Sequence, residues 1–219
     1  MLSQGRRGCV QMAQKEADED PVDISKVLFS PRSVAIIGAS RREGAVGHEI
    51  VKNLLDCKYP GKVFPINPKA DEILGLKCYP NVSSVEGKVD LGVVAVPAEI
   101  VSNVAEEAGE KGVKGLIVIS AGFKEVGSEG FERERELLDL CRRYNMRLVG
   151  PNCLGLINTF TPINASFAAQ MPLKGGIAFA SQSGALCTAV LDWAAREHIG
   201  FSHLISLGNM ADMDETDFM

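Results

Sequence analysis

The chain has 219 residues, of which 46% are hydrophobic and 23% charged, and its formal net charge is −5 at pH 7. This length allows a buried core larger than one average domain needs. The acidic balance gives no bulk electrostatic case for binding nucleic acid, and no apolar run approaches the roughly 20 residues of a membrane span.

Cysteine usage and the N-terminus indicate the compartment. The six cysteines are scattered without a C-x-x-C pair, and most lie within apolar segments. This distribution is typical of reduced cysteines and favours neither zinc nor disulfides. Residues 1–24 are polar, contain the acidic run Glu16 to Asp20, and lack the apolar region of a secretory signal. We therefore expect a disordered tail at 1–24 and a cytoplasmic protein.

From Ser33 onward, short apolar runs alternate with amphipathic segments. The pattern predicts strands at 33–37, 62–67, 89–96, 114–120 and 147–149. Helices are predicted between them at 46–56, 98–111 and 129–144. Continuous apolar strands separated by amphipathic helices indicate a parallel sheet covered on both faces. With right-handed crossovers, this predicts a doubly wound, Rossmann-like α/β domain over residues 25–150.

A second unit is predicted after residue 151. It contains a strand at 176–180, a helix at 184–198 and a strand at 201–207, and Asp214 to Asp217 could cap a further helix. One such strand-helix-strand unit does not easily close a core. We therefore expect a domain that is cut short, with a sheet edge and an apolar helix face left open. This predicts either self-association through residues beyond Pro151 or poor order in that half.

The loop after the first predicted strand has the composition of a phosphate-binding turn. It runs through Gly38, Ala39, Ser40, Arg41 and Arg42 and opens the next helix. Rossmann folds hold phosphate at this place on backbone N–H groups. The loop is not a complete G-x-G-x-x-G, and a glycine-rich turn with solvated arginines remains the alternative.

The second predicted strand ends in Asn67, Pro68 and Lys69. NAD-binding Rossmann domains usually carry Asp or Glu there, to bind the ribose 2′-hydroxyl. A lysine instead suits a phosphorylated ribose, such as the 3′-phosphate of coenzyme A (CoA) or the 2′-phosphate of NADP. A surface lysine that follows a turn proline is the alternative.

The ends of the later strands supply further candidates, because open α/β sheets bind ligands at the carboxyl ends of their strands. These candidates are Val96, Pro97, Ala98, Ile119, Ser120, Ala121, Asn152 and Cys153. In the second unit, Ser181, Ser183 and Gly184 can cap a helix or hold a phosphate. They lack the G-x-S-x-G spacing of a hydrolase nucleophile.

The histidines are poor catalytic candidates. His48 lies in the first predicted helix, His198 near a helix end and His203 at a strand start, and no acid stands in an obvious triad relation to them. We therefore expect no catalytic residue in this chain.

Taken together, these motifs resemble the α subunit of ADP-forming acetyl-CoA synthetase and the larger acyl-CoA synthetases, and more distantly succinyl-CoA synthetase α. The resemblance covers about residues 27–219. It rests on SPRSVAIIGAS, GKVFPINPK, VDLGVVAVPAE, GVKGLIVISAGF, GPNCLGLIN, GGIAFASQSGAL and SLGNMADMDETD. It implies a CoA-binding Rossmann-like domain over 25–150. It also implies an incomplete, flavodoxin-like domain of the succinyl-CoA synthetase kind over 151–219.

The resemblance also implies roles for the candidate residues. The loop from Gly38 to Arg42 would hold CoA phosphates, and Lys69 would meet a CoA phosphate or the ribose. Residues 96–98 and 119–121 would line the adenine and pantetheine path, and residues 150–153 would lie near the thiol. Ser181 to Gly184 would begin a helix whose N-terminus stabilises a phosphohistidine.

In this family, acyl-CoA and phosphate give an acyl phosphate, which phosphorylates a histidine that then phosphorylates ADP. The histidine and the ATP-grasp module have no counterpart here, and Met210 stands where relatives often carry Lys. We expect ATP, ADP and Mg to enter only through a β subunit or fused domain, and no turnover by this chain alone. The alternatives are a stand-alone CoA carrier or regulator, and an NAD(P)-dependent oxidoreductase, which the missing strand-end acid disfavours.

Overall fold

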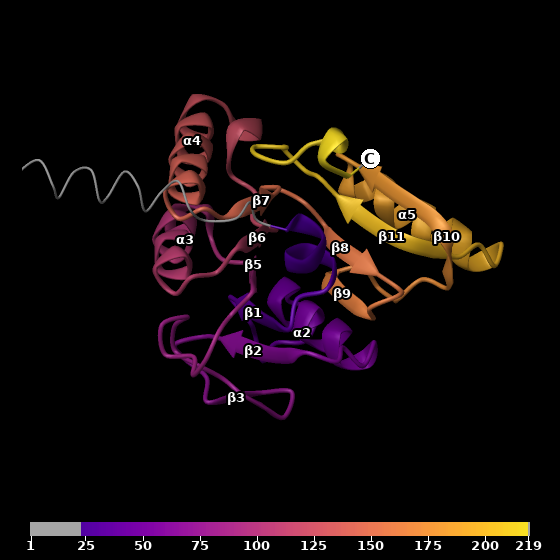
Figure 1. Ribbon diagram of the computed structural model, residues 1–219, viewed down its shortest axis with the longest axis horizontal. Helices are drawn as coiled ribbons and strands as arrows, with labels where there is room; N and C mark the ends of the chain where they lie inside the picture. Colours follow the sequence, from indigo (N-terminus) through magenta and orange to yellow (C-terminus); the bar gives the residue numbers. More distant parts are fainter. Residues whose placement is uncertain (1–22, 219) are drawn as a thin grey trace, which may run out of the picture.

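The computed structural model describes residues 23–218. The predicted tail at 1–24 lies almost wholly outside the described residues. Figure 1 shows two larger sheets, each with its own helices, placed side by side along the molecule. Among the described residues, no helix is both long enough and apolar enough to cross a membrane.

The first sheet confirms the predicted Rossmann-like fold. Its strands are all parallel and run in the order β2-β1-β5-β6-β7. They are β1 (Ser33–Ile37), β2 (Lys62–Ile66), β5 (Leu91–Val94), β6 (Gly115–Val118) and β7 (Arg147–Val149). The helices are α2 (Val46–Asp56), α3 (Val101–Glu110) and α4 (Ser128–Arg143). Short elements complete this half: η1 (Ser25–Phe29), β3 (Glu72–Ile73), β4 (Leu76–Lys77), η2 (Ala98–Ile100) and η3 (Lys124–Val126).

Both faces of this sheet are covered, as continuous apolar strands require. All five residues of β1 are buried. Val34 and Ile36 belong to the core cluster that includes residues of α2, whereas Ala35 and Ile37 belong to the cluster that includes residues of α3 and α4. Successive side chains of a strand point to opposite faces, so the helices cover the sheet from both sides.

The second sheet is mixed and runs in the order β10-β11-β8-β9. Its strands are β8 (Gly155–Asn158), β9 (Ile163–Ser166), β10 (Lys174–Ser181) and β11 (Phe201–Ser206), with α5 (Gly184–Arg196) between the last two. The predicted parallel pair β10 and β11 is present with its helix. The hairpin β8–β9 was not predicted, and it extends the sheet through antiparallel pairing of β8 with β11. The predicted helix start near Asp214 is a short 3₁₀ turn, η4 (Glu215–Phe218).

A buried asparagine ties the two halves together. Asn53 of α2 is 6% exposed, and its Nδ2 donates to the carbonyl oxygens of Ser166 at 2.9 Å and Ala168 at 2.8 Å. The hairpin β8–β9 therefore rests on a helix of the first sheet, and one core cluster holds residues of both halves. The domain boundary predicted at residues 150–151 stays a prediction.

The chain passes from one sheet to the other in residues 150–154, between the end of β7 and the start of β8. A second loop packs on this connection. The backbone N–H of Asn209 donates to the carbonyl oxygen of Pro151 at 2.8 Å. A Cβ on Gly208 would lie 2.2 Å from that oxygen, so the close approach requires glycine there.

Part of the second half lacks cover from the described residues. Ile177 of β10 is 48% exposed, and on α5 Leu186 is 50% and Trp193 56% exposed. Exposed apolar strand edges and helix faces favour pairing with another chain. The expected self-association through this surface stays a prediction.

Candidate functional site

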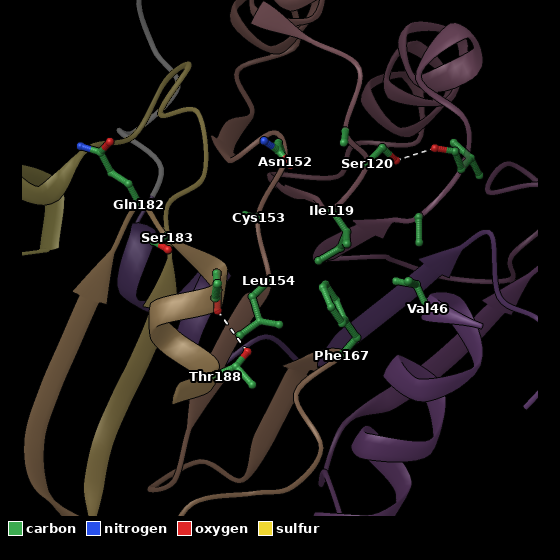
Figure 2. Close-up of a pocket in the computed structure, with 15 residues that line it drawn as sticks. Val46, Ile119, Ser120, Asn152, Cys153, Leu154, Phe167, Gln182, Ser183 and Thr188 are labelled. Carbon is green, nitrogen blue, oxygen red and sulfur yellow. Dashed lines mark hydrogen bonds between the residues drawn. The ribbon is translucent and has the colours of Figure 1, made fainter. Parts of the chain in front are cut away.

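A cavity of about 720 Å³ lies between the carboxyl end of the first sheet and the N-terminus of α5 (Figure 2). Eight of the predicted site residues line it: Val96, Ile119, Ser120, Ala121, Asn152, Cys153, Ser183 and Gly184. They come from both halves of the chain. The structure therefore brings together the strand-end motifs of the first sheet and the serine-rich turn of the second unit in a single cavity.

Hydrogen bonds fix the strand ends that form one wall. The Ser120 hydroxyl donates to the carbonyl oxygen of Val96 at 2.5 Å (Figure 2). The backbone N–H of Asn152 donates to the carbonyl oxygen of Ser120 at 3.0 Å. Asn152 has a φ of 58°, a left-handed conformation that asparagine tolerates better than most residues. Three successive strand ends are thus held to one another around the cavity.

The N-terminus of α5 faces this wall. The Ser183 Oγ accepts a hydrogen bond from the N–H of Leu186 at 3.2 Å, which makes Ser183 the N-cap. Ser181 accepts from the Ser183 N–H at 3.1 Å but does not line the cavity. The first turn of a helix carries N–H groups without acceptors in the helix and the positive end of its dipole. The cavity therefore has one end suited to an anion.

Cys153 is a cysteine that lines the cavity, and its thiol is unsuited to nucleophilic attack. Its residue is 5% exposed, and its Sγ donates to the carbonyl oxygen of Val118 at 3.3 Å. Burial raises the pKa of the thiol to about 12. The group is therefore a neutral thiol near pH 7, whereas the thiolate is the reactive form.

The glycine-rich loop and Lys69 lie together, outside the residues that line the cavity. The Nδ2 of Asn67 donates to the carbonyl oxygen of Ala39 at 2.7 Å, and Arg41 donates to that of Lys69 at 3.3 Å. The side chains of Arg41, Arg42 and Lys69 are exposed, so three cations gather on these two loops.

Two glycines allow close backbone contacts at the end of β1, Gly38 with the segment after β5 and Gly47 of α2 with Gly38 itself. Gly38 has a φ of 94°, and a Cβ there would lie 2.4 Å from the carbonyl oxygen of Ala95. A Cβ on Gly47 would lie 2.0 Å from the carbonyl oxygen of Gly38. Close helix–strand packing of this kind is a known use of glycine in dinucleotide-binding loops. The loop therefore allows close backbone approach, and its role in holding phosphate stays a prediction.

The remaining predicted residues lie outside the lining of the cavity. Ser40 acts within its own loop, where its Oγ accepts from the Arg42 N–H at 3.0 Å. Ala39 is 1% exposed and Ala98 9%, so their side chains are closed to solvent. Pro97 is exposed and precedes η2. Neither Pro97 nor Ala98 is among the residues that line the cavity.

None of the three histidines lines the cavity. The His203 ring packs edge-on against Phe29, with ring centroids 4.7 Å apart, and burial lowers its pKa. His48 is 8% exposed, and its Nδ1 lies 2.9 Å from the carbonyl oxygen of Ser40, in the glycine-rich loop. His48 therefore supports that loop. Its position in the sequence did not indicate this contact.

Sequence reasoning missed several lining residues, among them Val46, Phe167 and Thr188. Thr188 lies one helical turn after Gly184, and its hydroxyl donates to the Gly184 carbonyl at 3.1 Å. Helical spacing could have found it. Phe167 follows the unpredicted strand β9, so no local signal places it here.

Comparison with known proteins places the chain in a family. A model described as a CoA binding domain matches residues 32–159, and one described as a succinyl-CoA ligase like flavodoxin domain matches residues 174–219.

Among curated relatives, ADP-forming acetate–CoA ligase I of Archaeoglobus fulgidus is 53% identical over 192 residues, which cover 88% of this chain and 28% of the relative. The α subunit of ADP-forming acetate–CoA ligase II of Pyrococcus furiosus is 46% identical over 192 residues, 88% of this chain and 42% of that subunit. The solved structure of dinucleotide-forming acetyl-coenzyme A synthetase 1 of Ca. Korarchaeum cryptofilum, in complex with phosphate and ADP, matches with a TM-score of 0.86 and 44% identity. That match covers 90% of this chain and 42% of the other.

The chain thus spans between 28% and 42% of the length of these relatives. The CoA binding domain model covers more than half of the chain, and it includes the glycine-rich loop and the strand ends around the cavity. The protein therefore belongs to the CoA-binding domain family.

Proposed function

We propose that this chain is the CoA-binding portion of an ADP-forming acyl-CoA synthetase, an acid–CoA ligase. One observation carries the proposal: a single cavity joins the strand ends of the first sheet to the capped N-terminus of α5. A nucleotide-derived thiol and an anionic reaction partner would meet in such a cavity. The relatives named as ADP-forming acetate–CoA ligases support the same reaction class.

The residues present suit the parts of CoA. Arg41, Arg42 and Lys69 gather positive charge on adjacent loops, where the phosphates would lie. Ile119 and Ser120 would line the path of the pantetheine arm toward Asn152. Because burial keeps the Cys153 thiol neutral, the acyl group would not be carried on this cysteine.

The remaining chemistry would come from other modules. The family's acyl phosphate and phosphohistidine steps use a histidine and an ATP-grasp module that residues 23–218 do not supply. ATP or ADP and Mg would therefore enter through a β subunit or a fused domain. The name of the Pyrococcus furiosus relative, a subunit alpha, supports a second subunit as partner.

Calorimetry with CoA, dephospho-CoA and NAD tests the proposal. We expect binding of CoA in preference to NAD, because Lys69 occupies the place where an NAD site carries a carboxylate. Tighter binding of NAD than of CoA would refute it.

Lys69→Ala sharpens the test. If Lys69 pairs with the 3′-phosphate, the variant loses about 1.5–3 kcal/mol of CoA affinity, the scale of a hydrogen bond to a charged group. Dephospho-CoA should bind Lys69→Ala and the unsubstituted protein with the same affinity. Lys62→Ala is the matched control, because Lys62 is also exposed but begins β2, at the opposite end of the strand. Equal losses for CoA and dephospho-CoA would place Lys69 elsewhere on the ligand.

A further inference from the structure

One wall of the cavity is apolar. Val46 of α2, Leu154 of the connection between the sheets and Phe167 after β9 form it. Figure 2 shows Phe167 between Leu154 and Val46, with Ile119 above it. These side chains come from segments far apart in the sequence, and they face the same space.

The wall leaves large apolar side chains open to the cavity. Val46 is 37% exposed and Phe167 39%, whereas Leu154 is 3% exposed and backs them. An apolar surface that faces a cavity is completed by an apolar group of a ligand, because binding removes both surfaces from water.

The backbone that carries Phe167 is fixed on both sides. Asn53 donates to the carbonyl oxygens of Ser166 and Ala168, the two neighbours of Phe167. The Phe167 N–H donates to the carbonyl oxygen of Leu154 at 3.4 Å. An anchored backbone limits how far the ring can withdraw from a ligand, which favours selection by size.

The opposite side of the cavity is polar. Ser120, Asn152 and Ser183 line it, together with Gln182. The cavity therefore complements a ligand that has a polar, charge-bearing group at one end and a short hydrocarbon at the other.

We propose that Val46, Leu154 and Phe167 form the subsite for the hydrocarbon part of the acyl group, and that Phe167 limits the length of the acyl chain. The inference rests on the proposed function, which it deepens by assigning the residues that select the acyl group. Each methylene of the acyl group that fits against the wall increases the affinity of the acyl-CoA. Each one that clashes with the phenyl ring of Phe167 decreases it.

Calorimetric dissociation constants for CoA, acetyl-CoA and hexanoyl-CoA test this assignment. In Phe167→Ala, the ratio of the hexanoyl-CoA to the acetyl-CoA constant should fall about tenfold, because the removed ring makes room for added methylenes. In Phe167→Trp the ratio should rise. The constant for free CoA should change less than about twofold in both variants. Phe131→Ala is the control, since Phe131 is 54% exposed on α4 and should leave every ratio unchanged.

Three outcomes would overturn the assignment. An unchanged ratio in both Phe167 variants, with CoA still bound, would show that the acyl group lies elsewhere. Equal weakening of all three ligands would show that Phe167 contacts CoA itself. Absence of CoA binding by the unsubstituted protein would refute the proposed function and the subsite with it.

Discussion

Two strands of similar apolar sequence have opposite environments in this molecule. All five residues of β1 are buried between helices on both sides, whereas most of β10 is exposed at the edge of the second sheet. Both strands pair in parallel with a neighbour. The difference shows that an apolar strand sequence does not by itself reveal whether the strand is covered. The described residues cover both faces of the first sheet but leave the edge at β10 open.

The largest expected effect is a difference in unfolding free energy between substitutions in β1 and in β10. Ile36 of β1 is fully buried and Ile177 of β10 is 48% exposed. Ile36→Ala should lower the free energy of unfolding by about 2–5 kcal/mol, because it leaves a cavity in a packed core. Ile177→Ala should change it by less than about 0.5 kcal/mol. Urea denaturation of both variants measures the contrast, and equal losses would mean that β10 is covered in solution.

The next effect concerns the contact that joins the two regions. Asn53→Ala removes two hydrogen bonds and leaves the carbonyl oxygens of Ser166 and Ala168 without this donor. We expect a loss of about 1–3 kcal/mol of unfolding free energy. Asn103→Ala is the control, because Asn103 is exposed on α3. A loss no larger than that of the control would show that the halves are held together by apolar packing alone.

The smallest effect is a pH dependence at the boundary between the regions. The Cys153 thiol has its pKa raised from 9.0 to about 12 by burial, so the folded protein keeps a proton that the unfolded chain loses. This contribution to stability is complete below pH 9 and is lost as the pH rises from 9 toward 12. The unfolding free energy of the unsubstituted protein should therefore fall as the pH rises from about 8 to 10. That of Cys153→Ala should fall by about 1.4 kcal/mol less over the same range.

The matched variant for that measurement is Cys57→Ala. Cys57 is only partly buried, burial also raises the pKa of its thiol, and we therefore expect a change of slope in the same direction but smaller than that of Cys153→Ala. Denaturation curves at each pH give the unfolding free energy, and the slopes of this free energy against pH are compared. The comparison of slopes cancels any pH-independent effect of each substitution. Identical slopes for Cys153→Ala and the unsubstituted protein would show that the thiol is open to solvent.

Most of the first sheet was predictable because its strands are continuous apolar runs between amphipathic helices. The hairpin β8–β9 was not, because its strands are short and contain Asn158 and Asn164, residues that disfavour strands. Asn158 is buried instead, and its Nδ2 donates to the carbonyl oxygen of Phe29 at 2.8 Å. A partner so distant in sequence cannot be inferred from the local pattern.

The candidate site was likewise predictable from the sequence only in part. Residues at strand ends, such as Ser120 and Asn152, were predictable because the topology of a parallel sheet brings strand ends together. The convergence of Gly184 with them depends on how the two sheets pack, and the position of Phe167 depends on the unpredicted hairpin. The roles of the loop from Gly38 to Arg42 and of Lys69 in binding CoA stay predictions.

The connection in residues 150–154 has a consequence for variation in chain length. It carries the chain between the sheets, lines the cavity with Asn152 and Cys153, and is packed closely by Gly208. One inserted residue adds up to about 3.3–3.6 Å of reach, enough to move one wall of the cavity away from the other. The turn between β8 and β9 contributes no residue to the lining of the cavity, so a change of its length does not act on the cavity walls directly. The length of the connection in residues 150–154 therefore sets the width of the cavity.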